Sequence, residues 1–249
     1  MNRTLAAATL SLAALAAPAG AFDLTQMTED ERTAFRAEIR DYLLENPQVI
    51  MEAVAVLEQQ QTEQQAQADV DLVRVNAEAL FNNSDDWVGG NPDGDVTIVE
   101  FMDYRCGYCR QAFAEVEQLL EFDDNIRLVL KEFPILGEQS VMASRFALAT
   151  KAVAGDEAYK QVHDALMSYT GSIGTGSLTR LAEGLGLDAE AILAGMDAPG
   201  VDRIIAENRA LAGRLQIQGT PSFVFGEQMV RGYVPIDGMQ QLVEQVRAE

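Results

Sequence analysis

The decapeptide Phe101-Met102-Asp103-Tyr104-Arg105-Cys106-Gly107-Tyr108-Cys109-Arg110 contains both cysteines of the chain. It follows a run of β-branched and aromatic residues, 95–102, that predicts a strand. It also begins a segment, 107–122, with the apolar spacing of a helix, and a second predicted strand covers 126–133. The order strand, helix, strand predicts a βαβ unit with parallel strands and therefore an α/β fold.

The two cysteines stand where that helix is expected to begin. Unpaired backbone N–H groups and the positive end of the helix dipole meet there and favour a thiolate over a thiol. Arg105 and Arg110 add positive charge nearby. Cys109, one turn after Cys106, can attack a mixed disulfide formed by Cys106 and release the partner. We therefore expect a redox-active pair, with Cys106 as nucleophile and Cys109 as resolving thiol.

Two thiols could also bind a metal or staple the fold. A structural zinc site takes four ligands, often Cys and His, and the chain has one histidine, His163, which we expect to be structural. A copper(I) site would suit two soft thiolates, but the nine methionines that could support it are scattered. A bridge across so short a loop would stabilise the fold by only about 2 kcal/mol. Redox chemistry without a metal or other cofactor is the favoured interpretation.

The composition excludes several classes of partner. The chain has 249 residues and a formal net charge of −21, which argues against nucleic acid and anionic lipid, because both need clustered Lys and Arg. No apolar run reaches the ~20 residues that span a bilayer. Residues 1–21 have the parts of a secretory signal peptide, with Arg3, an apolar run at 5–17 and an Ala-x-Ala site that ends at Ala21. Export predicts an oxidising compartment, the periplasm, where disulfides persist.

An N-terminal helical arm is predicted over residues 22–86. Thr28–Glu31 has the spacing of a capping box, Asn46-Pro47 breaks the first helix, and a second helical stretch runs to about Phe81. Its middle, 59–67, is mostly Gln and cannot pack in the core of a small domain. A solvated linker helix and an oligomerisation arm are both open interpretations.

The loop 82–94, rich in Asn, Asp and Gly, marks a domain boundary, and a catalytic domain is expected over 87–249. Within it, the segment from about 138 to 215 is almost wholly helical, with breaks near Gly155, 171–176 and Pro199. The strands expected at 222–225 and 229–233 flank Gly226-Glu227 and predict a hairpin, and Asp237 is expected to cap a final helix. The domain thus starts as βαβ, finishes as ββα and carries a helical insertion.

A second motif, Gly219-Thr220-Pro221-Ser222-Phe223, precedes the hairpin. With Cys106-Gly107-Tyr108-Cys109 at a helix start and a helical insertion between the two motifs, the chain from about Asp95 resembles the DsbA-like branch of the thioredoxin superfamily. The resemblance implies a thioredoxin-like fold and a cis Thr220–Pro221 bond packed against the active-site disulfide. It also implies that the backbone of Thr220 pairs with an extended substrate chain.

The same resemblance implies a buried acid and a lysine partner. Glu100 lies six residues before Cys106, where DsbA-like proteins carry the acid, and Lys131 falls where they carry the lysine. We expect this pair to relay protons for Cys109; a surface ion pair of little energetic value is the alternative. DsbA oxidases usually carry Pro-His between the cysteines, whereas this chain has Gly107-Tyr108, so strong oxidising power is not implied.

The arm carries a further resemblance. Residues 42–50, Tyr-Leu-Leu-Glu-Asn-Pro-Gln-Val-Ile, are similar to the arm of the suppressor-of-copper-sensitivity protein C group, whose members also carry Cys-Gly-Tyr-Cys. In that group the arm joins subunits and the assembly shuffles incorrect disulfides. The resemblance implies a homo-oligomer held together through residues 23–57.

Together these observations predict an enzyme that exchanges or isomerises disulfides in exported cysteine-containing proteins. Isomerisation needs Cys106 in the reduced form, which implies a membrane thiol reductase of the DsbD type as electron donor. A dithiol oxidase is the alternative within this class. A copper(I)-binding protective protein that uses the same thiols, and a structural interaction protein that works through its arm, are alternatives from other classes.

Overall fold

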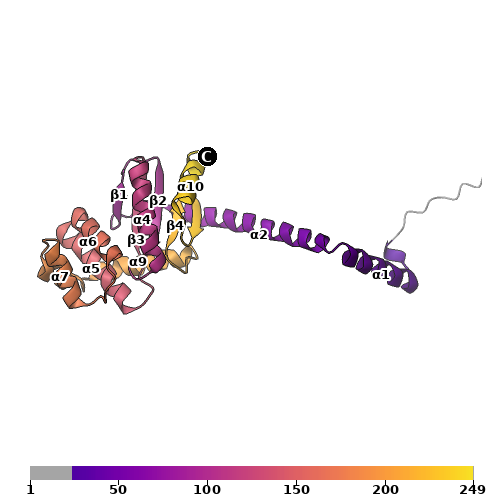
Figure 1. Cartoon of the computed structure of the whole chain (residues 1–249), viewed down its shortest axis with the longest axis horizontal. Coiled ribbons are helices and arrows are strands. Elements are labelled where there is room, and N and C mark those ends of the chain that lie inside the picture. The colour runs from indigo at the N-terminus through magenta and orange to yellow at the C-terminus, as the bar shows by residue number, and fades with distance from the viewer. Residues whose placement is uncertain (1–23, 249) are drawn as a thin grey trace, which may run out of the picture. The chain divides into compact units, whose positions relative to one another are not determined.

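The structure, a computed structural model, describes residues 24–248 (Figure 1). The predicted signal peptide, residues 1–21, lies outside the described residues. The chain divides into two compact units, and the division falls at Gln59–Gln60, inside helix α2 (Gln48–Val75). Within residues 24–248, each helix is either too short or too polar to cross a membrane.

The N-terminal unit, residues 24–59, is helical. It contains a short 3-10 turn (Leu24–Gln26), α1 (Glu29–Glu45) and the first part of α2. The predicted capping box is confirmed, because the Thr28 N–H donates to Glu31 Oε2 at 2.8 Å and the Glu31 N–H donates to Thr28 Oγ1 at 3.3 Å. The predicted break at Asn46-Pro47 is also present, and no residue of α1 is buried in the chain itself.

The larger unit, residues 60–248, is built on a five-stranded sheet in the order β1-β3-β2-β4-β5. The parallel pairing of β2 with β3 confirms the βαβ start, and every other neighbouring pair is antiparallel. The elements after α2 are α3 (Ala77–Phe81), β1 (Trp87–Gly90), β2 (Val96–Met102), α4 (Gly107–Phe122), β3 (Ile126–Glu132), α5 (Glu138–Ala154), α6 (Asp156–Ser168), α7 (Thr175–Gly184), α8 (Ala189–Gly195), α9 (Pro199–Arg214), β4 (Ser222–Phe225), β5 (Gln228–Arg231) and α10 (Ile236–Ala248).

The two faces of the sheet belong to different cores. Side chains alternate along a strand, so Ile98 and Met102 of β2 face the core that includes α4 and α10, whereas Val99 and Phe101 face the core that includes α3 and the end of α9. Residues of β3 divide in the same way, with Leu128 on the first face and Val129 on the second. This alternation decides where the charged residues of both strands point.

The predicted helical insertion is present as α5 to α9. Figure 1 shows α5, α6 and α7 gathered to one side of the sheet, away from α10. Gly155 separates α5 from α6 with φ of +86°, which an L side chain rarely adopts, and Pro199 is the first residue of α9. A further break, between α7 and α8, was not predicted, and Asp188 caps α8 there by accepting from the Ala191 N–H at 3.0 Å.

The larger unit begins earlier than the predicted boundary at residue 87. Val73 and Leu80 are buried in the core on the α3 side of the sheet, and Asp69 accepts two hydrogen bonds from Arg231 of β5, at 2.6 and 2.8 Å. These contacts make the C-terminal part of the long helix part of the larger unit. The loop predicted at 82–94 also contains strand β1, whose Trp87 is buried.

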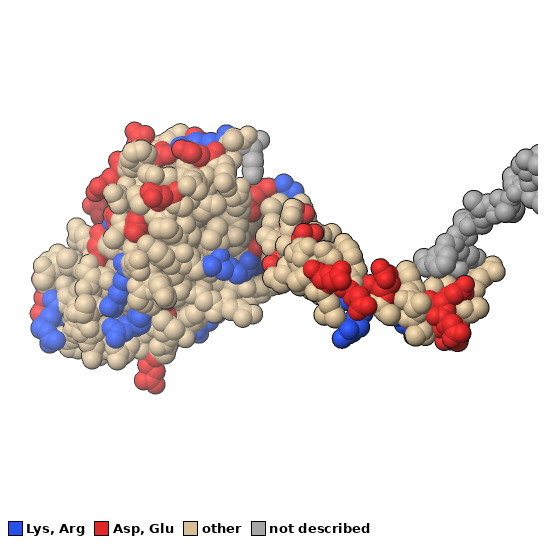
Figure 2. All heavy atoms as spheres, turned by 45° about the vertical axis from the view of Figure 1, so that its right-hand side comes forward, with Lys and Arg blue, Asp and Glu red and all other residues tan. Residues whose placement is uncertain are grey.

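The charges of the visible surface are mixed. Figure 2 shows separate groups of acidic side chains in the upper part of the larger unit on this face, with basic side chains at its top edge and further basic side chains lower down. The basic groups on this face form no continuous patch of the kind that binds a phosphate backbone.

Candidate active site

Cys106 lies at the junction of β2 and α4, where it is the N-cap residue of the helix. Its N–H donates to the carbonyl oxygen of Asp103 at 3.0 Å, so the chain turns sharply between the end of the strand and Gly107. Both cysteines are free thiols. Cys106 keeps 8% of its surface exposed, whereas Cys109 has none. Only the first sulfur can therefore meet a protein substrate directly.

The environment of Cys106 strongly favours its thiolate. The pKa of Cys106 falls to about 5, first because the Cys109 thiol donates a hydrogen bond to it and then because of the Thr220 side chain and the N–H groups of Cys109 and Tyr108; burial acts in the opposite direction. These hydrogen bonds, more than the two neighbouring arginines, stabilise the anion. A thiolate at neutral pH is the form that attacks disulfides.

Cys109 has the opposite environment. Burial raises its pKa, and the hydrogen bond to Cys106 and the Glu100 carboxylate raise it further. The Asp103 N–H lies 3.5 Å from its sulfur. The pair is therefore asymmetric, with an accessible thiolate and a buried thiol one turn apart.

The cis Thr220–Pro221 bond expected from the resemblance is present, between α9 and β4. The carbonyl oxygen of Thr220 lies 3.1 Å from Cys106 Sγ, which donates to it when protonated. Ser222, the next residue, donates from its hydroxyl to the Gly219 carbonyl at 2.9 Å and so holds the turn. The structure thus brings together Cys106, Cys109, Thr220 and Pro221.

Glu100 also belongs to this group of residues. Its side chain points to the face of Ile98 and Met102 and is 97% buried, and Oε1 has no hydrogen-bond partner among the described residues. Burial raises the pKa of Glu100 to about 8, and the negative charges of Cys106 and Glu117 add to the effect. Glu100 is therefore largely protonated at neutral pH, beside a buried thiol.

The expected pairing of Glu100 with Lys131 is wrong. Glu100 stands beside Leu130 in the parallel register, so Lys131, one residue further along β3, points to the other face of the sheet. There its ammonium group forms a buried ion pair with Asp86 and donates to the Ala79 carbonyl at 2.6 Å. Lys131 thus links α3, and the residue just before β1, to strand β3. It does not reach the cysteines.

The next residue, Glu132, is the centre of a buried network that was not predicted. Its carboxylate accepts from Tyr104 and Tyr159 at 2.8 and 2.7 Å and from Ser144 at 2.6 Å. Burial raises the pKa of Glu132 to about 7, and these three hydroxyl donors oppose the rise. Because Tyr104 lies two residues before Cys106, the network fixes the redox loop to the helices α5 and α6. The sequence signal that could have predicted this network is the charged residue Glu132 within an apolar predicted strand.

His163 lies against the same network, with Nδ1 3.1 Å from the Tyr104 hydroxyl. Its ring packs against those of Tyr104, Phe113 and Tyr159. Burial, followed by the charge of Lys160, lowers the pKa of His163 to about 3, so the ring is neutral. The histidine has the packing role that was expected. Among residues 24–248, no group of three or more His, Cys, Asp or Glu is placed to hold a metal ion.

Asp103 and the two arginines fix the loop from its other sides. Asp103 accepts from the N–H groups of Ile135 and Leu136 at 2.8 and 3.1 Å and from that of Arg105 at 2.7 Å. The guanidinium of Arg105 donates to the Gly171 carbonyl at 3.0 Å, and that of Arg110 donates to the Tyr104 carbonyl at 2.9 Å. The loop that presents Cys106 is thus held on several sides before any substrate arrives.

Comparison with known families identifies both parts of the chain. The family described as "DSBA-like thioredoxin domain" matches residues 97–244, and the "Copper resistance protein ScsC N-terminal domain" matches residues 31–64. The second match covers α1 and the beginning of α2, the region singled out by the resemblance of residues 42–50.

Solved structures agree with this division. A thioredoxin-like oxidoreductase from Silicibacter pomeroyi is 45% identical, with a TM-score of 0.65, over 69% of this chain and 98% of its own. ScsC of Proteus mirabilis in a compact conformation is 25% identical, with a TM-score of 0.62, over 87% of this chain and 98% of its own. Na(+)/H(+) antiporter NhaA 3 of Salinispora tropica is 31% identical over 159 residues, and the chain spans about a quarter of the length of such curated relatives.

Proposed function

The chain belongs to the family of DSBA-like thioredoxin domains, and from that premise we propose that it exchanges and isomerises disulfides in exported proteins. The observation that carries the proposal is the asymmetry of the two thiols. Cys106 is an accessible group whose pKa is lowered to about 5, and Cys109 is a buried group whose pKa is raised. This is the arrangement that a nucleophile and a resolving thiol need.

Isomerisation requires no net transfer of electrons. The Cys106 thiolate attacks one sulfur of a substrate disulfide, so that a mixed disulfide forms and a substrate thiolate leaves. That thiolate attacks another substrate disulfide, and a later substrate thiolate attacks the mixed disulfide and releases Cys106 unchanged. The Thr220 carbonyl lies 3.1 Å from Cys106 Sγ, and this short distance supports its proposed pairing with the backbone of the substrate during these steps.

Cys109 can release Cys106 from a mixed disulfide that no substrate thiolate resolves. It attacks the sulfur of Cys106 in the mixed disulfide, the substrate leaves as a thiol, and the Cys106–Cys109 disulfide forms at the expense of the substrate's bond. Two electrons must then return from a donor, for which a membrane thiol reductase of the DsbD type is the proposed partner. Cys109 must lose a proton to attack, and Glu100 is the proposed group that assists this transfer. A Glu100→Gln variant with an unchanged rate of resolution would sink that role.

A dithiol oxidase is the second candidate, and one observation favours it. A low pKa of the nucleophile stabilises the reduced enzyme and makes its disulfide more oxidising. The pKa of Cys106, about 5, is well below the ordinary value of 9.0. An oxidase would act as the Cys106–Cys109 disulfide and would need an electron acceptor in place of a donor.

The arm is proposed to join copies of the chain. Phe35, Ile39 and Tyr42 of α1 are between 40% and 53% exposed and recur at helical spacing, and Ile50, Val54 and Leu57 of α2 repeat the pattern at 40–57%. An apolar stripe of this kind needs a partner surface, and a second copy of the same arm would supply one. The proposed working form is therefore a periplasmic homo-oligomer that presents more than one Cys106.

Reactivation of a test protein with scrambled disulfides is the experiment that separates these functions. The reduced mature chain should restore its activity, and Cys106→Ser should abolish the effect. Reactivation that needed a supplied oxidant and began only from a fully reduced test protein would favour the oxidase. Failure of both assays, with tight copper(I) binding by the reduced chain, would replace exchange by metal protection.

A further inference from the structure

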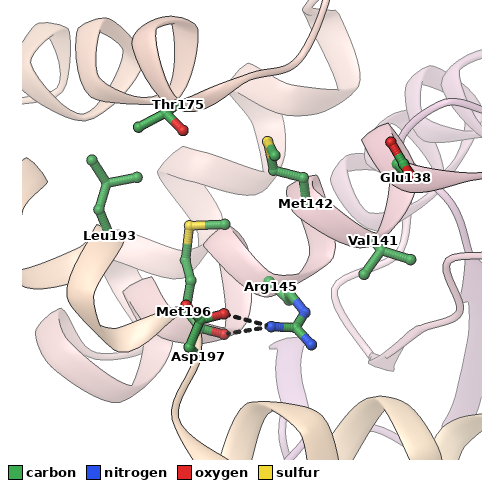
Figure 3. A pocket seen from close by; sticks show the side chains of 8 residues that line it. All are labelled: Glu138, Val141, Met142, Arg145, Thr175, Leu193, Met196 and Asp197. Atoms are coloured by element: carbon green, nitrogen blue, oxygen red, sulfur yellow. Dashed lines mark hydrogen bonds and ion pairs between the residues drawn. The ribbon is translucent and has the colours of Figure 1, made fainter.

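A cavity of about 480 Å³ opens on the helical insertion, between α5 and the segments around α7 and α8 (Figure 3). Apolar, half-buried side chains form its walls: Val141, Met142, Leu193 and Met196. Polar side chains stand at its rim: Glu138, Arg145, Thr175 and Asp197. In Figure 3 the thioethers of both methionines are directed toward the space between the helices. The cavity is thus an apolar recess with a polar edge.

The guanidinium at the edge is already paired with carboxylates. Arg145 donates to Asp197 at 2.8 Å and forms a second, short ion pair with Asp202. An apolar group that enters the recess therefore does not have to strip water from an unpaired guanidinium, which would oppose binding. The recess favours an uncharged, apolar occupant.

One side of the recess is bonded to the redox loop through the segment before α5. The N–H groups of Ile135 and Leu136 donate to the Asp103 carboxylate, and Glu138, two residues later, is already at the rim. Ile135 and Leu136 keep 37% and 53% of their surface exposed. They provide apolar surface between the residues that precede Cys106 and the recess.

The opposite side of the recess is bonded to the same loop. Arg105, the residue before Cys106, donates to the Gly171 carbonyl at 3.0 Å, and Thr175 at the start of α7 stands at the rim. The redox loop that carries Cys106 is therefore hydrogen-bonded to segments that lead into both sides of the recess.

We propose that this recess binds an apolar side chain of an unfolded polypeptide whose own cysteine reacts at Cys106, an inference that rests on the proposed function. Unfolded proteins expose the leucine and phenylalanine side chains that folding buries. Methionine is unbranched and adapts its shape, so Met142 and Met196 can accommodate different apolar side chains. The recess would favour unfolded substrates over folded ones and over small disulfides. It would not require a particular amino-acid sequence in the substrate.

The test measures attack by Cys106 on a set of short, polar peptides, in the full chain carrying Cys109→Ser. Each peptide has one cysteine, activated as a disulfide with a small thiol, and one leucine at a position that steps along the peptide. Attack forms the bond from Cys106 to the peptide and releases the small thiol. We expect a leucine at one spacing to speed the reaction about tenfold, a factor that needs ~1.4 kcal/mol, less than full burial of leucine provides.

The double variant Met142→Gln/Met196→Gln should remove this gain and react normally with the small disulfide alone. Met229→Gln, which changes a half-buried methionine of β5, is the matched control and should keep the gain. A gain that is absent at every spacing, or that survives in the double variant, would overturn the inference while leaving exchange intact. A chain whose Cys106 failed to react even with the small disulfide would overturn the proposed function and the inference with it.

Discussion

The two units of the chain treat polar and apolar groups in opposite ways. In residues 24–59, the apolar side chains Phe35, Ile39 and Tyr42 stay at least 40% exposed. In residues 60–248, even the charged side chains of Lys131 and Glu132 are at least 99% buried, with two and three hydrogen-bond partners respectively. The larger unit pairs most of its buried polar groups internally, with Glu100 Oε1 among the exceptions, whereas the arm leaves apolar surface uncovered by the chain itself.

Charges introduced into the apolar stripe of the arm should have the largest effect. In the variant Ile39→Asp/Val54→Asp, we expect the dissociation constant of the oligomer to rise at least about a hundredfold, because each buried aliphatic side chain contributes about 1.5–3 kcal/mol. Light scattering on the full chain measures the change, and Cys106 should keep its rate toward a small disulfide. A wild-type chain with a monomeric mass would refute the proposed role of the arm.

Removal of one buried acid should have the next largest effect. Glu132→Ala leaves the hydroxyls of Tyr104, Tyr159 and Ser144 without their acceptor, and we expect a loss of about 3 kcal/mol of unfolding free energy. Glu132→Gln should retain part of this stability, because its amide oxygen can still accept hydrogen bonds from the hydroxyl groups. The matched control in the arm is Glu38→Ala, an exposed site where the change should stay within about 0.5 kcal/mol. Equal urea midpoints for Glu132→Ala and Glu38→Ala would contradict the network's role.

The stability of the reduced larger unit should depend on the titration of Cys106. Its pKa is about 5 in the folded chain and 9.0 ordinarily, so the lowered value stabilises the reduced fold most above pH 9. This contribution to the stability of the reduced chain should decline as the pH falls from 9 to 5 and vanish below about pH 5. The thiolate absorbance gives the pKa, and the urea midpoint of the reduced chain, less that of Cys106→Ser, gives its effect on stability. A midpoint difference independent of pH would argue against it.

The smallest effect is expected at the surface of the larger unit. Arg74 of α2 forms a bidentate pair with Glu227, at 2.8 and 2.6 Å, but both side chains are more than 40% exposed. Arg74→Ala should cost at most about 1 kcal/mol, because solvent screens such pairs. Asp69→Ala, which breaks the half-buried pair with Arg231, should cost more in the same denaturation assay. The reverse order would mean that burial does not decide the strength of these contacts.

Local patterns in the sequence predicted the elements that carry the chemistry. The apolar runs of β2 and β3, the helix start at Cys106 and the turn at Thr220–Pro221 are each contained in a few neighbouring residues. The strand β1 was missed because Gly89 and Gly90 resemble loop residues. It is a strand because it pairs with β3 and because Trp87 is buried, and both facts depend on the folded chain.

The error at Lys131 has a related cause. Glu100 and Lys131 each look like a charged residue in a buried strand, and the sequence does not state the register between two strands. A shift of one residue moves a side chain to the other face of the sheet. In the observed register Glu100 stands beside Leu130, so Glu132, not Lys131, shares its face. The early start of the larger unit also depends on a contact that is distant in the sequence. Asp69 and Arg231 are 162 residues apart and meet only in the folded chain.

The network around Glu132 has a consequence for protein engineering. Its carboxylate comes from the sheet, whereas two of its three donors, Ser144 and Tyr159, come from the helical insertion. The insertion is therefore not an independent cassette. A chimera that receives the insertion of a relative would need hydroxyl groups at these two places, or would have to replace Glu132 with an apolar residue at the same time. Designers who exchange such blocks to alter substrate choice should transfer the three positions as one unit.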